Sequence, residues 1–369
     1  MNRRQLITAT AGVAASQVIQ PGGQPLQAAP SKPMLMKLGC QSGPTSEKRL
    51  QFFARHGVQA VSGYAEDSQK KGYFSVEDLS RLKDRCEKHK VSLDCIEPGF
   101  LASSHIDKTE RPAIMLGQSP QRDRDIEHLQ NTIRNCAKVG IPSIKYNMSL
   151  LGVLRTERTP GRGGTTLSTW RLKEARVSKA FAPLTKAGEV TAERYWERIT
   201  YFLDRVIPVA SESKIRMACH PHDPGVPPKV GFQGVDAVLG TPDGLKKFLS
   251  IRESPYHGLN FCQGTVSEML QDPGKEIYDV IRYFGSRKKI FNVHFRNIRG
   301  RRDDFQETYP DEGDVDFVKA MMVYRDVGYP YMIMPDHVPH HEDDPGGNQA
   351  FAFAYGHIRG LIQAVGQMA

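Results

Sequence analysis

Four side chains of the kinds that bind metals close four successive apolar segments in the second half of the chain. They follow one another at separations of 42, 32 and 42 residues and are His220, Cys262, His294 and Asp336. Each separation is close to one strand–helix unit with its loops. Core packing has no reason to prefer such residues at the same place in four units, so we expect their side chains to converge. Two imidazoles, a thiolate and a carboxylate suit a divalent transition metal such as Zn²⁺, Fe²⁺, Co²⁺ or Mn²⁺.

Two further polar residues stand next to members of this set. Arg296 lies two residues after His294, so strand alternation points both side chains to the same side. Its guanidinium could hold a carboxylate through two parallel hydrogen bonds. His337 directly follows Asp336, and an imidazole that titrates near neutral pH is suited to general acid or base catalysis.

The elements that must position these groups are visible as short apolar segments that alternate with helical patterns. Eight strands are predicted at 34–40, 58–64, 91–97, 143–148, 215–220, 258–262, 290–294 and 331–336. The clearest helices are predicted at 75–90, 122–139, 192–213, 314–327 and 348–367. Eight such units predict an α/β protein with a single closed (β/α)8 TIM barrel. An open doubly wound sheet is disfavoured, because no Gly-x-Gly-x-x-Gly follows an early strand.

Three more residues fall at the carboxyl-terminal side of this barrel. Tyr146 and Asn147 end the fourth predicted strand, and Glu307 lies in the loop after the seventh. Active sites of such barrels are built at that face, so we expect these three residues to bind the substrate.

Long insertions follow the third and fourth strands, at 102–121 and 150–190. Both emerge at the same face as the candidate site, where long loops often serve as lids. For residues 158–188, a lid over the site and a disordered insertion are equally compatible with the sequence.

Residues 1–30 have the layout of an export signal that precedes the barrel, which is predicted to span residues 31–369. Arg3 and Arg4 are the only charged residues before a short, mildly apolar run and a segment of small residues. The pair resembles a twin-arginine signal, which predicts export to the periplasm or cell envelope. If the leader is not used, the protein would be cytoplasmic.

Composition narrows the remaining functional classes. The chain has 369 residues and a net charge of +9, but its 50 basic and 41 acidic residues are interspersed. A nucleic-acid role is disfavoured, because like charges form no long run. No apolar stretch is long enough to span a membrane. The six cysteines form no Cys-x-x-Cys pair, so, apart from Cys262, they are predicted to be small buried hydrophobic residues.

Several motifs together resemble those of the metal-dependent D-mannonate dehydratase family. They include His-Pro-His-Asp-Pro at 220–224, Gly-Leu-Asn-Phe-Cys-Gln-Gly at 258–264, His-Phe-Arg-Asn at 294–297, Phe-Gln-Glu at 305–307 and Pro-Asp-His at 335–337. The resemblance runs from about residue 35 to 365 and implies a xylose-isomerase-like barrel with a Mn²⁺-type site. It implies that the ligands are His220, Cys262, His294 and Asp336. Arg296 and His337 would belong to the catalytic group.

The function implied is metal-dependent dehydration of a sugar acid, D-mannonate, to 2-keto-3-deoxy-D-gluconate and water. Mn²⁺ is the expected metal, with Fe²⁺ and Co²⁺ as alternatives, and the expected partner is a small anionic sugar acid. An isomerase or epimerase that acts through a metal-stabilised enediolate on the same barrel is the alternative. A non-catalytic, metal-stabilised sugar-binding protein is a third hypothesis. The sequence does not determine the oligomeric state, and a homo-oligomer is one possibility.

Overall fold

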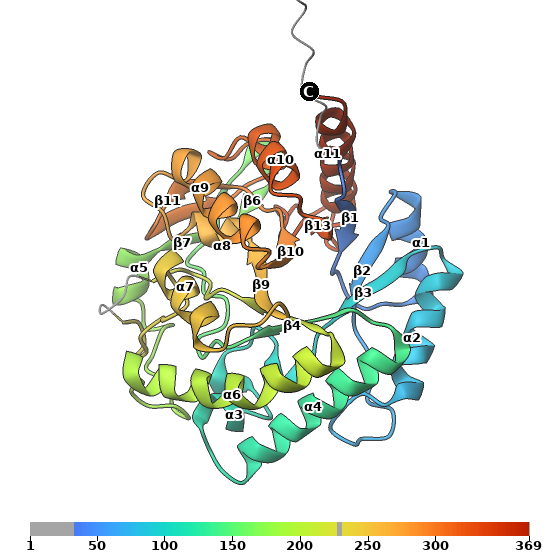
Figure 1. The fold of residues 1–369 in the computed structure, drawn as a ribbon. Helices are drawn as coiled ribbons and strands as arrows, with labels where there is room; N and C mark the ends of the chain where they lie inside the picture. Colours follow the sequence, from blue (N-terminus) through green and yellow to red (C-terminus); the bar gives the residue numbers. More distant parts are fainter. Residues whose placement is uncertain (1–32, 227–230, 369) are drawn as a thin grey trace, which may run out of the picture.

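A closed barrel of eight parallel strands forms the centre of the computed structural model, which describes residues 33–226 and 231–368 (Figure 1). In their order around the barrel, the strands are β1 (Lys37–Cys40), β2 (Ala60–Gly63), β3 (Ser92–Ile96), β4 (Ser143–Asn147), β8 (Arg216–His220), β9 (His257–Cys262), β10 (Ile290–His294) and β13 (Met332–Met334). The barrel closes where β1 pairs with β13 in parallel. The predicted TIM barrel and its eight strands are thus confirmed. The predicted leader lies outside the described residues.

Helices surround the barrel and pack against its outer face (Figure 1). The longer ones are α1 (Glu47–Arg55), α2 (Val76–Lys88), α4 (Gln121–Val139), α6 (Ala192–Ser213), α7 (Pro242–Ile251), α9 (Pro273–Ser286), α10 (Phe317–Asp326) and α11 (Asn348–Gln367). The predicted limits of the helices at 192–213 and 348–367 coincide with those of α6 and α11. The helix predicted at 314–327 begins later, because the side chain of Asp316 accepts a hydrogen bond from the Lys319 amide and caps α10 there. Among the described residues, no helix is long and apolar enough to cross a membrane.

The two sides of each strand differ in what they bury. Outward side chains join the large apolar core between strands and helices, whereas an inward group of Ala60, Cys95, Met332 and Met334 forms a small separate cluster. All six cysteines lie in the described part of the chain, are buried and form no disulfide, as predicted for small hydrophobic residues. Above the inward apolar cluster, toward the carboxyl ends of the strands, the inner positions are polar.

The long insertion after β4 is folded. It contains β5 (Thr159–Pro160), β6 (Thr166–Leu167), β7 (Thr169–Arg171) and α5 (Leu172–Val177). β5 and β6 pair with each other, while β7 pairs with β12 (Asp304–Glu307) and β12 pairs in turn with β11 (Ile298–Arg301). In Figure 1 this three-stranded antiparallel sheet lies where the green β7 meets the orange β11.

A backbone bridge also joins Thr166 to His340, in the segment after β13. These pairings fix the insertion to the carboxyl-terminal side of the barrel, so the prediction of a disordered insertion is wrong. The insertion after β3 is shorter and contains the 3-10 turn η2 (Ile106–Lys108) and the helix α3 (Ala113–Leu116).

Candidate active site

Three of the predicted metal ligands meet where β8, β9 and β10 end. Ligand atoms of His220, Cys262 and His294 all lie within 4.8 Å of one another, and all three residues are buried. Asp336, just after β13, adds its carboxylate, with Oδ1 3.3 Å from His294 Nδ1 and Oδ2 3.5 Å from Cys262 Sγ. Ligand atoms that share one ion at 2.0–2.3 Å are about 3–4 Å apart. The structure therefore brings all four predicted ligands together.

In each of the two histidines, one ring nitrogen makes no hydrogen bond to the described part of the chain. His220 Nδ1 donates to the carbonyl of Pro221 at 2.7 Å, which leaves Nε2 as the unprotonated nitrogen. His294 Nε2 accepts a hydrogen bond from the side-chain nitrogen of Asn260 at 3.1 Å, while Nδ1 is buried without a hydrogen-bond partner and lies 3.3 Å from Asp336 Oδ1. A buried ring nitrogen that faces a thiol and a carboxylate is a partner for a metal ion. The donor set thus fits a divalent metal.

The charge states of two of these groups agree with that assignment. Burial lowers the pKa of His220, which favours the neutral imidazole that binds metals. Burial raises the pKa of Asp336, but His337, His294 and Arg296 hold it well below its usual range. Thr265 donates its backbone N–H and its hydroxyl to Cys262 Sγ, at 3.4 and 3.1 Å, as a thiolate ligand requires.

A second polar cluster of two arginines and three carboxylates lies beside the metal ligands. It consists of Arg155, Asp223, Glu268, Arg296 and Glu307. Burial and the charge of Asp223 raise the pKa of Glu268 well above its usual range, although Arg296 and Arg155 oppose this shift. The arginines hold the pKa of Asp223 far below its usual range despite burial. Two buried arginines are therefore shared among three buried carboxyl groups in this cluster.

The structure corrects the role expected for Arg296. Its guanidinium is fully buried and bonded to Glu307, to Asp223 at 2.9 Å and to the Thr265 hydroxyl at 2.9 Å, while Nε lies 3.3 Å from Asp336. No edge of the guanidinium is free to hold a substrate carboxylate, because protein oxygens already face it. Arg296 is thus a positioning residue that contacts the groups around the metal ligands.

His337 and Glu307 form a pair at the open side of the centre. His337 Nδ1 lies 2.8 Å from Glu307 Oε2, and 40% of the His337 side chain is exposed. Partial burial lowers the pKa of His337, but the charges of Asp336 and Glu307 outweigh it and raise the pKa to about 9. Burial raises the pKa of Glu307, but Arg155 and Arg296 bring it down to about 2. The structure brings the predicted residues His337 and Glu307 together. The Glu307 carboxylate contacts Arg155, Arg296 and His337 of the protein itself.

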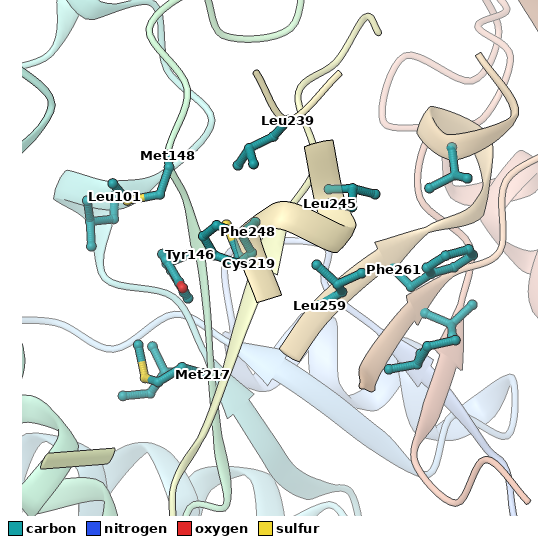
Figure 2. Close-up of a cluster of buried hydrophobic side chains, with 14 of the residues drawn as sticks. Leu101, Tyr146, Met148, Met217, Cys219, Leu239, Leu245, Phe248, Leu259 and Phe261 are labelled. Carbon is teal, nitrogen blue, oxygen red and sulfur yellow. The ribbon is translucent and has the colours of Figure 1, made fainter. Parts of the chain in front are cut away.

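Strand alternation separates Tyr146 from Asn147. Tyr146 is fully buried, and its ring packs 5.5 Å from that of Phe202 on α6, on the outer side of β4. Figure 2 shows it among buried hydrophobic side chains such as Cys219 and Phe248. The prediction that Tyr146 binds substrate is therefore wrong. Asn147 points inward, lies beside His220 in the strand register and donates to Glu97 at 3.3 Å.

Some residues at this site carry no sequence signal that distinguishes them. Arg155 is one of several arginines in a long insertion, yet it links Asp223 and Glu307 across the site. Lys145 lies in the apolar strand β4, and Gln41 directly follows the apolar strand β1. The Lys145 ammonium donates to the Gln41 side chain, which in turn donates to Asp336. Glu268 is also buried here, because α8 (Gln263–Ser267) turns the chain inward directly after β9. Of the residues of the second polar cluster that were not predicted individually, Asp223 alone lies in a motif named from the sequence, His-Pro-His-Asp-Pro at 220–224.

Comparison with known proteins shows what this chain is similar to. A family model described as D-mannonate dehydratase (UxuA) matches residues 41–171 and 165–369. Mannonate dehydratase of Thermotoga petrophila is 30% identical over 313 residues, which cover 76% of this chain and 82% of that protein. The structure of mannonate dehydratase from Streptococcus suis serotype 2 matches with a TM-score of 0.75 at 23% sequence identity. The match covers 89% of this chain and 93% of that one. A xylose isomerase domain protein from Planctomyces limnophilus shares the fold, with a TM-score of 0.57 at 14% sequence identity. That match covers 90% of this chain and 99% of the other.

The chain has the fold of the xylose-isomerase-like class of barrels, and its barrel mouth gathers side chains that fit a divalent metal. Within that class the chain belongs to the D-mannonate dehydratase family, whose model covers most of its length. It is therefore a lyase, a sugar-acid dehydratase that breaks a carbon–oxygen bond. The family match does not support the isomerase or epimerase, nor the non-catalytic sugar-binding protein.

Proposed function

We propose that this protein converts D-mannonate into 2-keto-3-deoxy-D-gluconate and water. The observation that carries the proposal is the convergence of four ligand side chains at one barrel mouth beside a histidine–glutamate pair, in a chain of this family. In the reaction the C2–H bond and the C3–O bond break, and the proton and the hydroxyl group that are lost correspond to one water. The resulting enol becomes the 2-keto group as C3 takes up a proton and the C2 hydroxyl loses one. The substrate is a small anion, in line with the predicted partner.

The metal would be held by His220, Cys262, His294 and Asp336. When bound, it supplies a Lewis acid that stabilises the negative charge developing as the C2 proton leaves. We propose Mn²⁺ as the physiological ion, with Fe²⁺ and Co²⁺ as alternatives. The mixed donor set of imidazole, thiolate and carboxylate groups supports this range of metals.

We assign the general-acid role to His337. Its Nδ1 is held by Glu307, so Nε2 is the atom that would give a proton to the leaving C3 hydroxyl. Despite burial, the charges of Asp336 and Glu307 raise the pKa of His337, which favours its protonated form. Glu307 in turn is fixed by Arg155 and Arg296, so the imidazolium keeps one orientation.

The direct test is turnover by metal-loaded protein. Separate samples reconstituted with Mn²⁺, Fe²⁺ and Co²⁺ are incubated with D-mannonate, and the 2-keto-3-deoxy acid is measured. We expect product with at least one metal. D-gluconate, the C2 epimer, is the matched substrate control and should react far more slowly. Absence of product with all three metals would remove D-mannonate as the substrate.

A variant of His337 tests the acid role separately. His337→Gln should lower kcat by about 10²–10⁴-fold, the usual contribution of a general acid, while the bound metal stays at the parent's level. Metal content measured on the same samples distinguishes loss of the proton donor from loss of the centre. A variant with full kcat would contradict the assignment.

We also propose that residues 1–30 direct export of the protein. The support is the Arg3–Arg4 pair before a mildly apolar run and a small-residue segment. Twin-arginine export carries proteins that are already folded, which suits an enzyme whose six thiols are buried and unpaired.

A further inference from the structure

Lys145 is a buried cation in the barrel interior that the proposed reaction does not use. It lies on β4 two residues before Asn147, so strand alternation turns it inward, away from the outer core that holds Tyr146. Only 8% of its side chain is exposed. Burying a charged group costs several kcal/mol unless its contacts compensate, so those contacts indicate its role.

The ammonium group of Lys145 has two protein acceptors. Nζ lies 2.9 Å from Glu97 Oε2 and donates to Gln41 Oε1 at 3.0 Å. Burial lowers the pKa of Lys145, but the charge of Glu97 outweighs it and raises the pKa above its usual value. The lysine is therefore charged, and the Asn147 amide holds Glu97 from the other side at 3.3 Å.

The contact with Gln41 decides which way that amide faces. Because Lys145 occupies the carbonyl oxygen of the Gln41 side chain, the amide nitrogen points to the opposite side. There it donates to Asp336 Oδ1 at 2.9 Å. The other carboxylate oxygen of Asp336 faces Arg296 Nε at 3.3 Å. A continuous chain of contacts thus runs across the barrel from Glu97 through Lys145 and Gln41 to a proposed metal ligand.

We propose that Lys145 is a positioning residue of the metal centre, which acts through Gln41 to fix the carboxylate of Asp336. This inference rests on the proposed function only in taking Asp336 as a ligand. Removal of Lys145 frees the Gln41 amide to rotate, and the carboxylate then loses the hydrogen bond that its Oδ1 accepts from Gln41. Groups that orient ligands typically contribute about 10–100-fold to metal affinity.

Titration of the metal-free protein with Co²⁺ tests the inference without any substrate. Gln41→Leu should raise the apparent Kd for Co²⁺ by about 10–100-fold and alter the cobalt–thiolate absorption band. Lys145→Met is paired with Glu97→Gln, so that no buried carboxylate is left unpaired, and should raise the Kd similarly. Both sets of substitutions interrupt the same chain of contacts. The triple variant, which combines Gln41→Leu with Lys145→Met and Glu97→Gln, should therefore lose no more affinity than the one of the two that shows the larger loss.

Lys289→Met is the matched control. Lys289 is also a buried lysine with a glutamate partner, Glu253, but it lies just before β10, at the opposite end of the barrel. Its variant should keep the parent's Co²⁺ affinity. Unchanged affinity in Gln41→Leu would overturn the inference, as would strictly additive losses in the triple variant. Because no turnover is measured, either result is independent of whether D-mannonate is the substrate.

Discussion

At the scale of single residues, a thiolate among the proposed ligands distinguishes this centre from sites built only of imidazoles and carboxylates. Cys262 and Cys219 lie near the ends of neighbouring strands, yet alternation gives them different surroundings. Cys262 faces His294 and Asp336 inside the barrel, whereas Cys219 lies in the outer apolar core (Figure 2).

This difference gives a prediction for metal content. Cys262→Ala removes a proposed ligand and should weaken Co²⁺ binding by about 100-fold or more. Cys219→Ala makes the same chemical change on the other side of the barrel wall and should leave binding intact. Both affinities are measured by titration, and folding is checked by circular dichroism. Equal metal binding by the two variants would exclude Cys262 as a ligand.

A second residue-scale prediction concerns His257, at the start of β9 and far from the metal ligands. The side chain is fully buried, and burial lowers its pKa to about 4, although its hydrogen bond to the Arg252 carbonyl opposes this shift. The unfolded chain has the ordinary pKa of about 6.5. The contribution of neutral His257 is therefore complete above pH 6.5 and is lost as the pH falls toward 4.

His257→Phe removes this titration. Between pH 7 and pH 4, the free energy of unfolding of the variant should improve relative to the parent by about 3 kcal/mol. Denaturant unfolding at each pH measures the difference, and the value at pH 7 serves as the baseline for the lost hydrogen bond. A difference that does not change with pH would show that His257 is not held neutral.

At the scale of elements, one buried arginine of the segment after β4 adds side-chain contacts with the site to the backbone pairings of that segment. Arg155 joins Asp223, which follows β8, to Glu307 on β12. On the same segment Arg162 pairs with Asp311 in a half-exposed contact at 2.6 Å. The two arginines thus offer a buried and an exposed ion pair in one stretch of chain.

Their removal should differ in cost. Arg155→Met leaves two buried carboxylates without one of their partners and should lower the free energy of unfolding by about 3 kcal/mol. Amide hydrogen exchange over residues 150–171 should become faster. Arg162→Met should cost about 1 kcal/mol or less, because water screens its partner. Comparable effects of the two changes would show that Arg155 does not anchor the segment.

The elements also show where prediction from sequence succeeds. The eight strands and the limits of α6 and α11 follow from local apolar patterns, which tertiary packing reinforces. The sheet of β7, β12 and β11 has no such pattern, because Trp170 and Phe305 pair across a long sequence separation. Ligand positions were predicted because four units share one register. The role of Tyr146 was predicted wrongly because it was assigned from the position of Tyr146 at the strand end alone. Alternation along β4 turns this side chain outward, away from the barrel interior.

The partners of Arg296 were missed for a related reason. Its spacing from His294 indicates the correct side of the strand but not which groups arrive there from other segments. Asp223, Glu268 and Glu307 come from three different connections, and their convergence on one guanidinium is a property of the folded barrel. Sequence spacing therefore predicted the convergence of the four candidate ligands better than it predicted the contacts of this arginine.

At the scale of the whole molecule, the proposed export can be tested through the leader. Replacing Arg3 and Arg4 together by lysine keeps the charge but removes the arginine pair. In a bacterial host with twin-arginine export, the parent should be found in the periplasm and the variant in the cytoplasm, as measured by fractionation and immunoblotting. Cytoplasmic retention of both would overturn the proposal.

The pairing of β7 with β12 also constrains how this barrel can be altered. Protein engineers often exchange one surface loop of a barrel enzyme to change its substrate. Here the strand contributed after β4 completes a sheet whose central strand, β12, ends at Glu307. Exchange of the β4 segment alone would leave an open edge on β12. The transferable module is therefore discontinuous in sequence, and a successful graft must carry both segments from the same donor.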